Sequence, residues 1–200
     1  INMSISAQEV KELRDRSGVG MMDCKKALIE ANGDLEKAFE VLRKNGIAKA
    51  QKKAGRDAKE GSVVAYIHPG AKLGVLLELN CETDFVANTD DFKDLANDIC
   101  MHIAATSPIS VKSEDVDSTI LDKEKEIYTE QAKQSGKPDA IIEKMVEGRL
   151  KKFLQENVLL EQNFVKDPSK TITDLITDKV SVLGENIVVN SFSRFQIGEK

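Results

Sequence analysis

The hydrophobic pattern changes period in the second third of the chain, and this change limits the fold more than any other feature. Gly61 opens an alternating stretch that ends at His68, and Pro-Gly-Ala-Lys at 69–72 is typical of a turn. A second alternating stretch then places one set of apolar residues on a single face: Val75, Leu77, Leu79 and Cys81. The pattern predicts two strands in an antiparallel hairpin.

Before this hairpin, apolar residues recur with helical spacing. Ser6 and Glu9 form a capping-box pattern, which predicts a helix from Ser6 to about Arg16. Two further helices are predicted from the stripes Cys24, Ala27, Leu28, Ala31 and Leu35, Ala38, Phe39, Leu42. We expect the third helix to stop at Asn45-Gly46. Three short helices of this kind predict a small bundle, and such bundles usually serve as docking modules.

After the hairpin, helical and strand patterns follow one another. We expect an amphipathic helix from Asp90 to Ile103, a helical hairpin at about 120–157, a last helix over 171–183 and a returning strand over 187–197. The fold class is therefore α+β, with a small antiparallel sheet backed by helices. We place the helical bundle and a basic linker helix in residues 1–55 and the core domain in residues 56–200.

Composition excludes several classes of protein. The chain has 29 Lys and Arg against 34 Asp and Glu, and this net charge of −5 argues against a general nucleic-acid binder. No apolar run approaches the ~20 residues that span a membrane, and the N-terminus lacks a secretory apolar region. Three widely spaced cysteines fit neither a disulfide framework nor a zinc site. We expect a reduced, cytoplasmic protein whose natural first residue is Met3.

The segment from Arg43 to Lys59 is strongly basic, with seven basic residues against the single acidic residue Asp57. A solvated linker helix is the favoured interpretation. The alternative is a segment that follows a phosphate backbone, but the segment lacks the interleaved aromatic residues that single-strand binders use for stacking.

A methionine pair, Met21 and Met22, precedes the lysine pair Lys25 and Lys26. Methionines near a helix start are more often core filler than anything else. The functional alternative is an adaptable apolar patch rimmed by lysines, which suits a protein-binding surface.

Residues 79–88 carry the strongest functional signal: Leu-Asn-Cys-Glu-Thr-Asp-Phe-Val-Ala-Asn. The segment begins as the end of an apolar strand, becomes a polar turn and precedes a helical pattern. The turn places a carboxylate, Asp84, beside an aromatic ring, Phe85. The ring is interpreted either as a plug that turns inward and caps the core or as a wedge that enters another protein.

Catalytic and metal-binding patterns are not found in the sequence. Gly18-Val19-Gly20 lacks the third glycine and the preceding strand of a phosphate loop. His68 and His102 have neither zinc nor triad spacing, and His102 is expected to be structural. Four aspartates lack the ligand spacing of a calcium loop: Asp84, Asp90, Asp91 and Asp94. We therefore expect no catalytic residues, no metal site, no cofactor and no enzymatic activity.

Two stretches together resemble one known family. They are Val10-Lys-Glu-Leu-Arg-Asp-Arg-Ser-Gly-Val-Gly-Met-Met-Asp-Cys-Lys-Lys-Ala-Leu28 and Asn80-Cys-Glu-Thr-Asp-Phe-Val86. Both are similar to signatures of the bacterial elongation factor Ts family, the guanine-nucleotide exchange factors for elongation factor Tu. The tail Gly184-Glu-Asn-Ile-Val-Val189 is similar to that family's closing strand, so the likeness covers essentially the whole chain.

The resemblance implies a function and its residues. Residues 1–55 would be a ubiquitin-associated-like (UBA-like) bundle that docks on the GTP-binding domain of elongation factor Tu. A four-residue segment would displace magnesium from the partner's nucleotide site, with the second and third residues inserting between two partner helices: Thr83, Asp84, Phe85 and Val86. A further group would lie at or near the docking surface: Arg14, Met21, Met22, Cys24 and Lys25.

The chain departs from the longer members of the family in its length. It resembles the short form, in which a homodimer supplies a second core, and residues 121–154 would form the dimer-forming or projecting part. No membrane and no direct nucleic-acid partner are expected. Two other functions remain open: a protein-binding module without exchange activity, and an RNA-binding accessory factor that uses the segment from Arg43 to Lys59.

Overall fold

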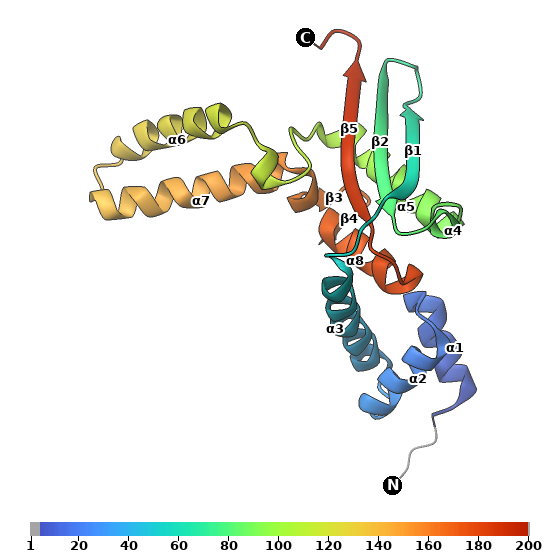
Figure 1. Cartoon of the computed structure of the whole chain (residues 1–200). Helices are drawn as coiled ribbons and strands as arrows, with labels where there is room; N and C mark the ends of the chain where they lie inside the picture. Colours follow the sequence, from blue (N-terminus) through green and yellow to red (C-terminus); the bar gives the residue numbers. More distant parts are fainter. Residues whose placement is uncertain (1–4, 200) are drawn as a thin grey trace. The chain divides into compact units, whose positions relative to one another are not determined.

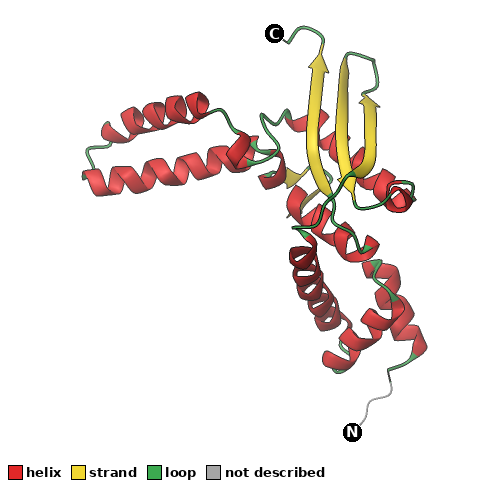
Figure 2. Ribbon diagram, in the orientation of Figure 1, coloured by secondary structure: helices red, strands yellow, loops and turns green. Residues whose placement is uncertain are grey.

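The computed structural model describes residues 5–199, so Met3 lies outside the described residues. The chain forms two compact units, which are described separately below. Of the described residues, unit 1 comprises 5–62, 79–95 and 174–188, and unit 2 comprises 63–78, 96–173 and 189–199. The described residues form helices and a small antiparallel sheet, which confirms the predicted α+β class (Figures 1 and 2).

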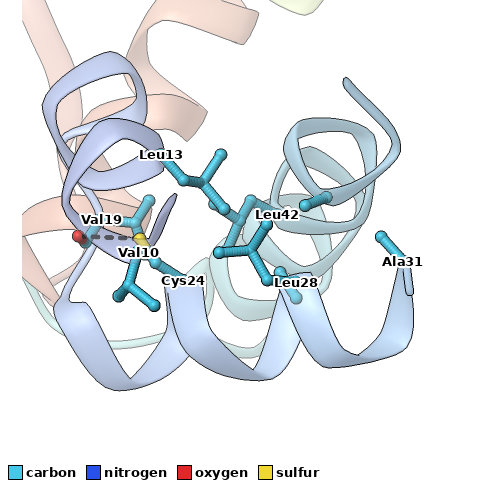
Figure 3. Close-up of a cluster of buried hydrophobic side chains, with 9 residues drawn as sticks. Val10, Leu13, Val19, Cys24, Leu28, Ala31 and Leu42 are labelled. Carbon is cyan, nitrogen blue, oxygen red and sulfur yellow. Dashed lines mark hydrogen bonds between the residues drawn. The ribbon is translucent and has the colours of Figure 1, made fainter. Parts of the chain in front are cut away.

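Unit 1 contains the predicted three-helix bundle: α1 (Ala7–Ser17), α2 (Met21–Glu30) and α3 (Leu35–Lys53). The capping box at α1 is present, because the backbone N–H of Ser6 donates to the Glu9 carboxylate at 2.7 Å and the Ser6 hydroxyl accepts from the Glu9 N–H at 3.2 Å. Buried side chains from the three helices and the α1–α2 turn form its core (Figure 3): Val10, Leu13, Val19, Cys24, Ala27, Leu28, Ala31, Ala38 and Leu42. The predicted stripes of the second and third helices are thus found here, with Leu35 and Phe39 partly buried against the core.

The third helix does not stop at Asn45-Gly46, and that prediction was wrong. Helix α3 continues to Lys53, and Gly46 is buried within it. A Cβ built on Gly46 would lie 3.1 Å from the hydroxyl oxygen of Ser181, and the neighbouring Val182 packs against the bundle core. The glycine therefore permits close approach of another helix rather than a turn. Packing of this kind overrides the weak helix propensity of Asn-Gly.

Unit 1 also contains parts of four later elements. They are the last residues of β2 (Leu73–Cys81), the short helix α4 (Asp84–Ala87), the first residues of α5 (Asp90–Thr106) and most of α8 (Ile172–Leu183). Helix α8 ends where predicted, at Gly184, whose φ of +79° lies in the left-handed region that glycine tolerates.

The three-stranded sheet has the order β1-β2-β5, with strands β1 (Glu60–Ile67), β2 and β5 (Val188–Gln196). The predicted inward set on β2, Val75, Leu77, Leu79 and Cys81, is buried. Within unit 2, the Arg194 side chain donates to the carbonyl of Ala104 on α5 at 3.3 Å, so α5 lies against one face of the sheet. The opposite face leaves several apolar side chains exposed: Val63, Ile67, Leu76, Phe195 and Ile197.

Unit 2 also contains the predicted helical hairpin, formed by α6 (Ser118–Lys133) and α7 (Asp139–Asn157), which run side by side (Figure 1). A small cluster holds them together: Ala132, Ile142 and Val146, with Tyr128, Met145 and Leu150 partly buried around it. Two short strands were not predicted, β3 (Asn163–Phe164) and β4 (Asp167–Thr171). Strands of two and five residues that include Asp-Pro-Ser give no alternating pattern to detect.

His102 is structural, as expected from the sequence. The ring is fully buried in unit 2, where Nε2 lies 3.0 Å from the Gln162 side-chain oxygen and Nδ1 accepts from the Val165 N–H at 3.2 Å. Burial lowers the pKa of His102, because the charged imidazolium is disfavoured away from water. The histidine therefore serves as a hydrogen-bonded core residue.

Candidate functional site

The segment with the strongest sequence signal forms a one-turn helix at the exit of β2. Thr83 is the N-cap of α4, with extended backbone dihedrals of −134° and 155°. Its hydroxyl oxygen accepts from the backbone N–H of Val86 at 3.4 Å. At the other end, the N–H of Asn88 donates to the Asp84 carbonyl at 3.1 Å. The chain thus makes a single closed helical turn between the strand and α5.

Helix α4 buries one side and exposes the other. Ala87 is buried and Val86 is half-buried, whereas Asp84 is exposed and the Phe85 side chain is 83% exposed. The interpretation of Phe85 as an inward plug was therefore wrong. Phe92, at the start of α5, is fully buried instead and supplies the aromatic side chain of the core in this region.

A carboxylate from a distant part of the chain anchors the start of α4. Glu185 Oε2 accepts from the backbone N–H groups of Glu82 and Thr83, at 3.1 and 3.0 Å. Glu185 Oε1 accepts from the Thr83 hydroxyl at 2.7 Å. In return, Glu82 Oε1 accepts from the backbone N–H of Asn186 at 2.7 Å. Segments 82–83 and 185–186 are therefore joined in both directions, because each provides a carboxylate that accepts backbone N–H groups of the other.

Glu185 is not among the site residues predicted from the sequence. Its position directly after the glycine that ends α8 was visible, and the tail 184–189 carried part of the family resemblance. However, the sequence has no feature that pairs this carboxylate with an N-cap about one hundred residues earlier, because the pairing arises from tertiary contacts.

Hydrogen bonds and nearby positive charges keep the Glu82 carboxylate ionised. The backbone N–H of Asn186 lowers the pKa of Glu82 most, and the nearby charges of Arg56 and Lys53 lower it further. The Arg56 guanidinium lies 3.5 Å from the Glu82 carboxylate. An anionic Glu82 therefore accepts the Asn186 N–H across the neutral pH range.

The thiol beside this network has a raised pKa. Cys81 is fully buried and donates its S–H to the Thr83 carbonyl at 3.1 Å. Burial raises the pKa of the Cys81 thiol, and the charge of Glu185 raises it further. The protonated thiol thus acts as one more hydrogen-bond donor to the start of α4.

The predicted docking residues lie on α1 and α2 of the same unit. Arg14 and Lys25 are exposed, and the Met21 and Met22 side chains are 42% and 67% exposed. The interpretation of the methionine pair as core filler was wrong. Buried Val19 supplies the inward apolar group at this end of α2, so the methionines remain at the surface.

Cys24, the fifth predicted docking residue, faces the bundle interior (Figure 3). Its thiol donates to the Val19 carbonyl at 3.4 Å, and the side chain is fully buried. Cys24 therefore supports α2 from beneath, whereas the exposed methionines and Lys25 form the surface above it.

The basic segment uses several of its charges within its own chain. Lys49 pairs with Asp23 at 2.6 Å, and Lys53 donates to the Gly184 carbonyl. Arg56 pairs with Glu82, and Lys59 lies 2.8 Å from Asp57. Four of the seven basic side chains in the segment 43–59 thus have intramolecular partners, which favours a structural helix over a phosphate-binding track.

Residues 5–199 contain neither a cluster of metal ligands nor a membrane-spanning helix. No group of three or more His, Cys, Asp or Glu side chains in that range could hold a metal ion. Within the same range, no helix is both long and apolar enough to cross a membrane.

Comparison with known proteins gives one consistent result. A sequence model of the family described as "Elongation factor TS" matches residues 28–199. Elongation factor Ts of Fervidobacterium nodosum is 62% identical over 197 residues, which cover 98% of this chain and 100% of the relative. The proteins of the same name from Thermosipho melanesiensis and Caldanaerobacter subterraneus subsp. tengcongensis are 59% and 58% identical, each over 98% of this chain and over 100% and 98% of the relative. The chain therefore belongs to the elongation factor Ts family of translation elongation factors.

Proposed function

We propose that this protein is a guanine-nucleotide exchange factor that binds elongation factor Tu in its GDP form and promotes GDP release by displacing magnesium. One observation supports this most strongly: Phe85 projects from a short anchored helix with 83% of its surface exposed. A large apolar ring held in water at a strand exit gains free energy only when another surface covers it.

The proposed roles follow the geometry of unit 1. The bundle in residues 1–55 acts as the docking module, which we propose is UBA-like, and residues 56–200 act as the core. Met21, Met22, Lys25 and Arg14 contact the partner, with Cys24 beneath them. Thr83 and Val86 hold α4, while Asp84 and Phe85 enter the partner.

Exchange requires coupling rather than a chemical step. A factor that weakens nucleotide binding must itself bind more weakly when nucleotide is present, by the same ratio. Burial of an exposed Phe side chain is worth roughly 2–3 kcal/mol, which corresponds to about 30- to 150-fold in an equilibrium constant. Insertion of Phe85 therefore supplies free energy of the size that opening a nucleotide site needs.

Magnesium belongs to the partner's nucleotide site in this mechanism. The ion bridges phosphate oxygens and neutralises their charge in GTPases, so its loss weakens nucleotide binding. Asp84 lies next to Phe85 at the exposed side of α4 and brings a negative charge to the opened site. No covalent intermediate and no cofactor are involved.

The direct test is GDP release from elongation factor Tu loaded with a fluorescent GDP analogue, measured by stopped flow with and without this protein. We expect release to accelerate at least about 100-fold at saturating protein, in line with the free energy of Phe burial. Complex formation without acceleration would indicate a non-exchanging binding module. Absence of binding, together with salt-dependent RNA binding, would indicate the RNA-binding function instead.

We also propose that the protein forms a homodimer through the exposed face of the three-stranded sheet. A hollow of about 760 Å³ on unit 2 is lined in part by Ile67, Leu76, Phe195 and Ile197. Exposed apolar groups of this kind mark interaction surfaces, and a second copy of the same face is complementary in polarity. The helical hairpin, by contrast, packs Ala132, Ile142 and Val146 between its own two helices, although a few isoleucines on its outside are exposed.

A charge on this face should separate the subunits. We expect the double substitution Phe195→Asp and Ile197→Asp to raise the dimer dissociation constant at least about 100-fold, because unpaired carboxylates would be buried. Analytical ultracentrifugation measures the effect. The matched substitution Ile141→Asp, on the exposed side of α7, should leave the dimer intact. Dissociation by Ile141→Asp alone would place the interface on the hairpin instead.

A further inference from the structure

The exposed ring of Phe85 belongs to a helix that is too short to be stable by itself. Helix α4 has four residues, and isolated helices below about 12 residues are marginal in water. At its start, the Val86 N–H donates to the Thr83 hydroxyl oxygen over a long 3.4 Å, whereas at its end the Asn88 side chain and the Thr89 hydroxyl donate to the Asp84 and Val86 carbonyls at 2.9 and 2.8 Å. The start of α4 is therefore its weakly held end, and a group from another part of the chain is needed to fix it.

We propose that Glu185 is a positioning residue for nucleotide exchange, because its carboxylate holds the start of α4 so that Phe85 meets the partner in one orientation. The inference rests on the proposed function. It adds a residue that neither touches the partner nor belongs to the segment that inserts.

Three hydrogen bonds to one carboxylate carry the inference. Glu185 accepts from two successive backbone N–H groups and from the Thr83 hydroxyl, at 3.1, 3.0 and 2.7 Å. Bonds to an ionised acceptor are stronger than neutral ones, and three of them fix both position and angle. The two N–H groups belong to residues 82 and 83, immediately before α4, so any movement of the helix base would break them.

The hydroxyl of Thr83 transmits this anchoring to the helix. Because the hydroxyl donates its proton to Glu185, its oxygen lone pairs remain available to the Val86 N–H. Glu185 thus selects the hydroxyl orientation that caps α4. Removal of the carboxylate frees the hydroxyl to rotate, and the single turn that carries Phe85 loses its N-terminal cap.

Glu185 is itself held in place from several sides. It follows Gly184, whose carbonyl accepts from the Lys53 ammonium at the end of α3. It precedes Asn186, whose side chain donates to the Arg56 carbonyl at 2.9 Å. The carboxylate is therefore connected to the end of the bundle's third helix, and α4 is anchored to a rigid part of unit 1 rather than to a loose tail.

The test uses Glu185→Ala and Glu185→Gln in the full chain, with Glu147→Ala on the exposed surface of α7 as the matched control. Hydrogen exchange of the amides in residues 82–88 reports the anchoring directly. We expect it to accelerate about tenfold in Glu185→Ala, which loses all three bonds, and less in Glu185→Gln, which keeps one acceptor. Glu147→Ala should leave it unchanged.

Exchange activity reports the consequence. We expect Glu185→Ala to lower the maximal rate of stimulated GDP release about tenfold, while the concentration of factor for half-maximal effect changes less than about twofold. In the Phe85→Ala background the same substitution should cause no further loss, since Glu185 acts through Phe85.

The outcomes separate this inference from the proposed function. Unchanged amide exchange, or an equal loss of rate in both backgrounds, would overturn the positioning role. A loss of activity with Phe85→Ala but not with either Glu185 variant would overturn it too, and would leave the proposed function intact. Full activity of Phe85→Ala would instead refute the wedge and, with it, the role of Glu185.

Discussion

Phe85→Ala should reduce the stimulated release of GDP from elongation factor Tu about 100-fold, since burial of a Phe side chain is worth roughly 2–3 kcal/mol. The substitution removes the ring that we propose opens the partner and leaves the docking bundle untouched. Stopped-flow release of a fluorescent GDP analogue, at saturating concentration of the variant, measures the effect.

The same substitution should leave the protein folded. With 83% of its surface exposed, Phe85 contributes little to the core, so the free energy of unfolding should change by less than about 0.5 kcal/mol. A loss of activity without a loss of stability distinguishes an exposed ring from a buried one. A buried plug would show the reverse, a stability loss of several kcal/mol, as expected for the fully buried Phe92.

A matched control makes the result specific. Ile141 on α7 is also an exposed apolar residue, and Ile141→Ala should retain full exchange activity. If Phe85→Ala accelerated GDP release as well as the unchanged protein does, insertion of an aromatic ring would not be the mechanism.

Local patterns determined most of the fold. The capping box at Ser6, the alternation along β2 and the glycine after α8 each specify a structure through neighbours a few residues away. Local patterns of this kind predicted the first two helices, the β1–β2 hairpin, the helical hairpin and the last strand. Where the sequence pattern misled, at Gly46, the deciding contact was with Ser181, more than one hundred residues along the chain.

In the candidate site, too, neighbouring residues could be identified from the sequence, whereas contacts between distant residues could not. Its residues could be singled out from the sequence, because an aromatic ring follows a carboxylate at a polar strand exit in a chain with seven Phe and no Trp. Whether Phe85 and the methionine pair turn inward could not be decided, since apolar residues are common on both sides of a protein surface. Glu185 could be identified as the anchor of α4 only from the tertiary structure.

Substitution of Gly61 should cause a large loss of stability. Its φ of +142° lies in the region that side chains rarely adopt. A Cβ at this position would lie 2.2 Å from the Leu79 carbonyl oxygen and 2.7 Å from the Asn80 Cα. Both contacts are with backbone, so no flexible side chain can move aside. Strand β1 can therefore approach the end of β2 only with glycine here.

We expect Gly61→Ala to lower the free energy of unfolding by about 3 kcal/mol, the sum of dihedral strain and displacement of a paired strand. For a chain of this size the melting temperature should fall by about 10 °C, which differential scanning calorimetry measures. Gly55→Ala is the matched control, because a Cβ there meets nothing within 4 Å, and its effect should stay within about 0.5 kcal/mol. Equal melting temperatures for the two variants would show that β1 and β2 do not pack this closely. The loss would also reach the function, because the displaced end of β2 leads within two residues to Thr83, which caps α4.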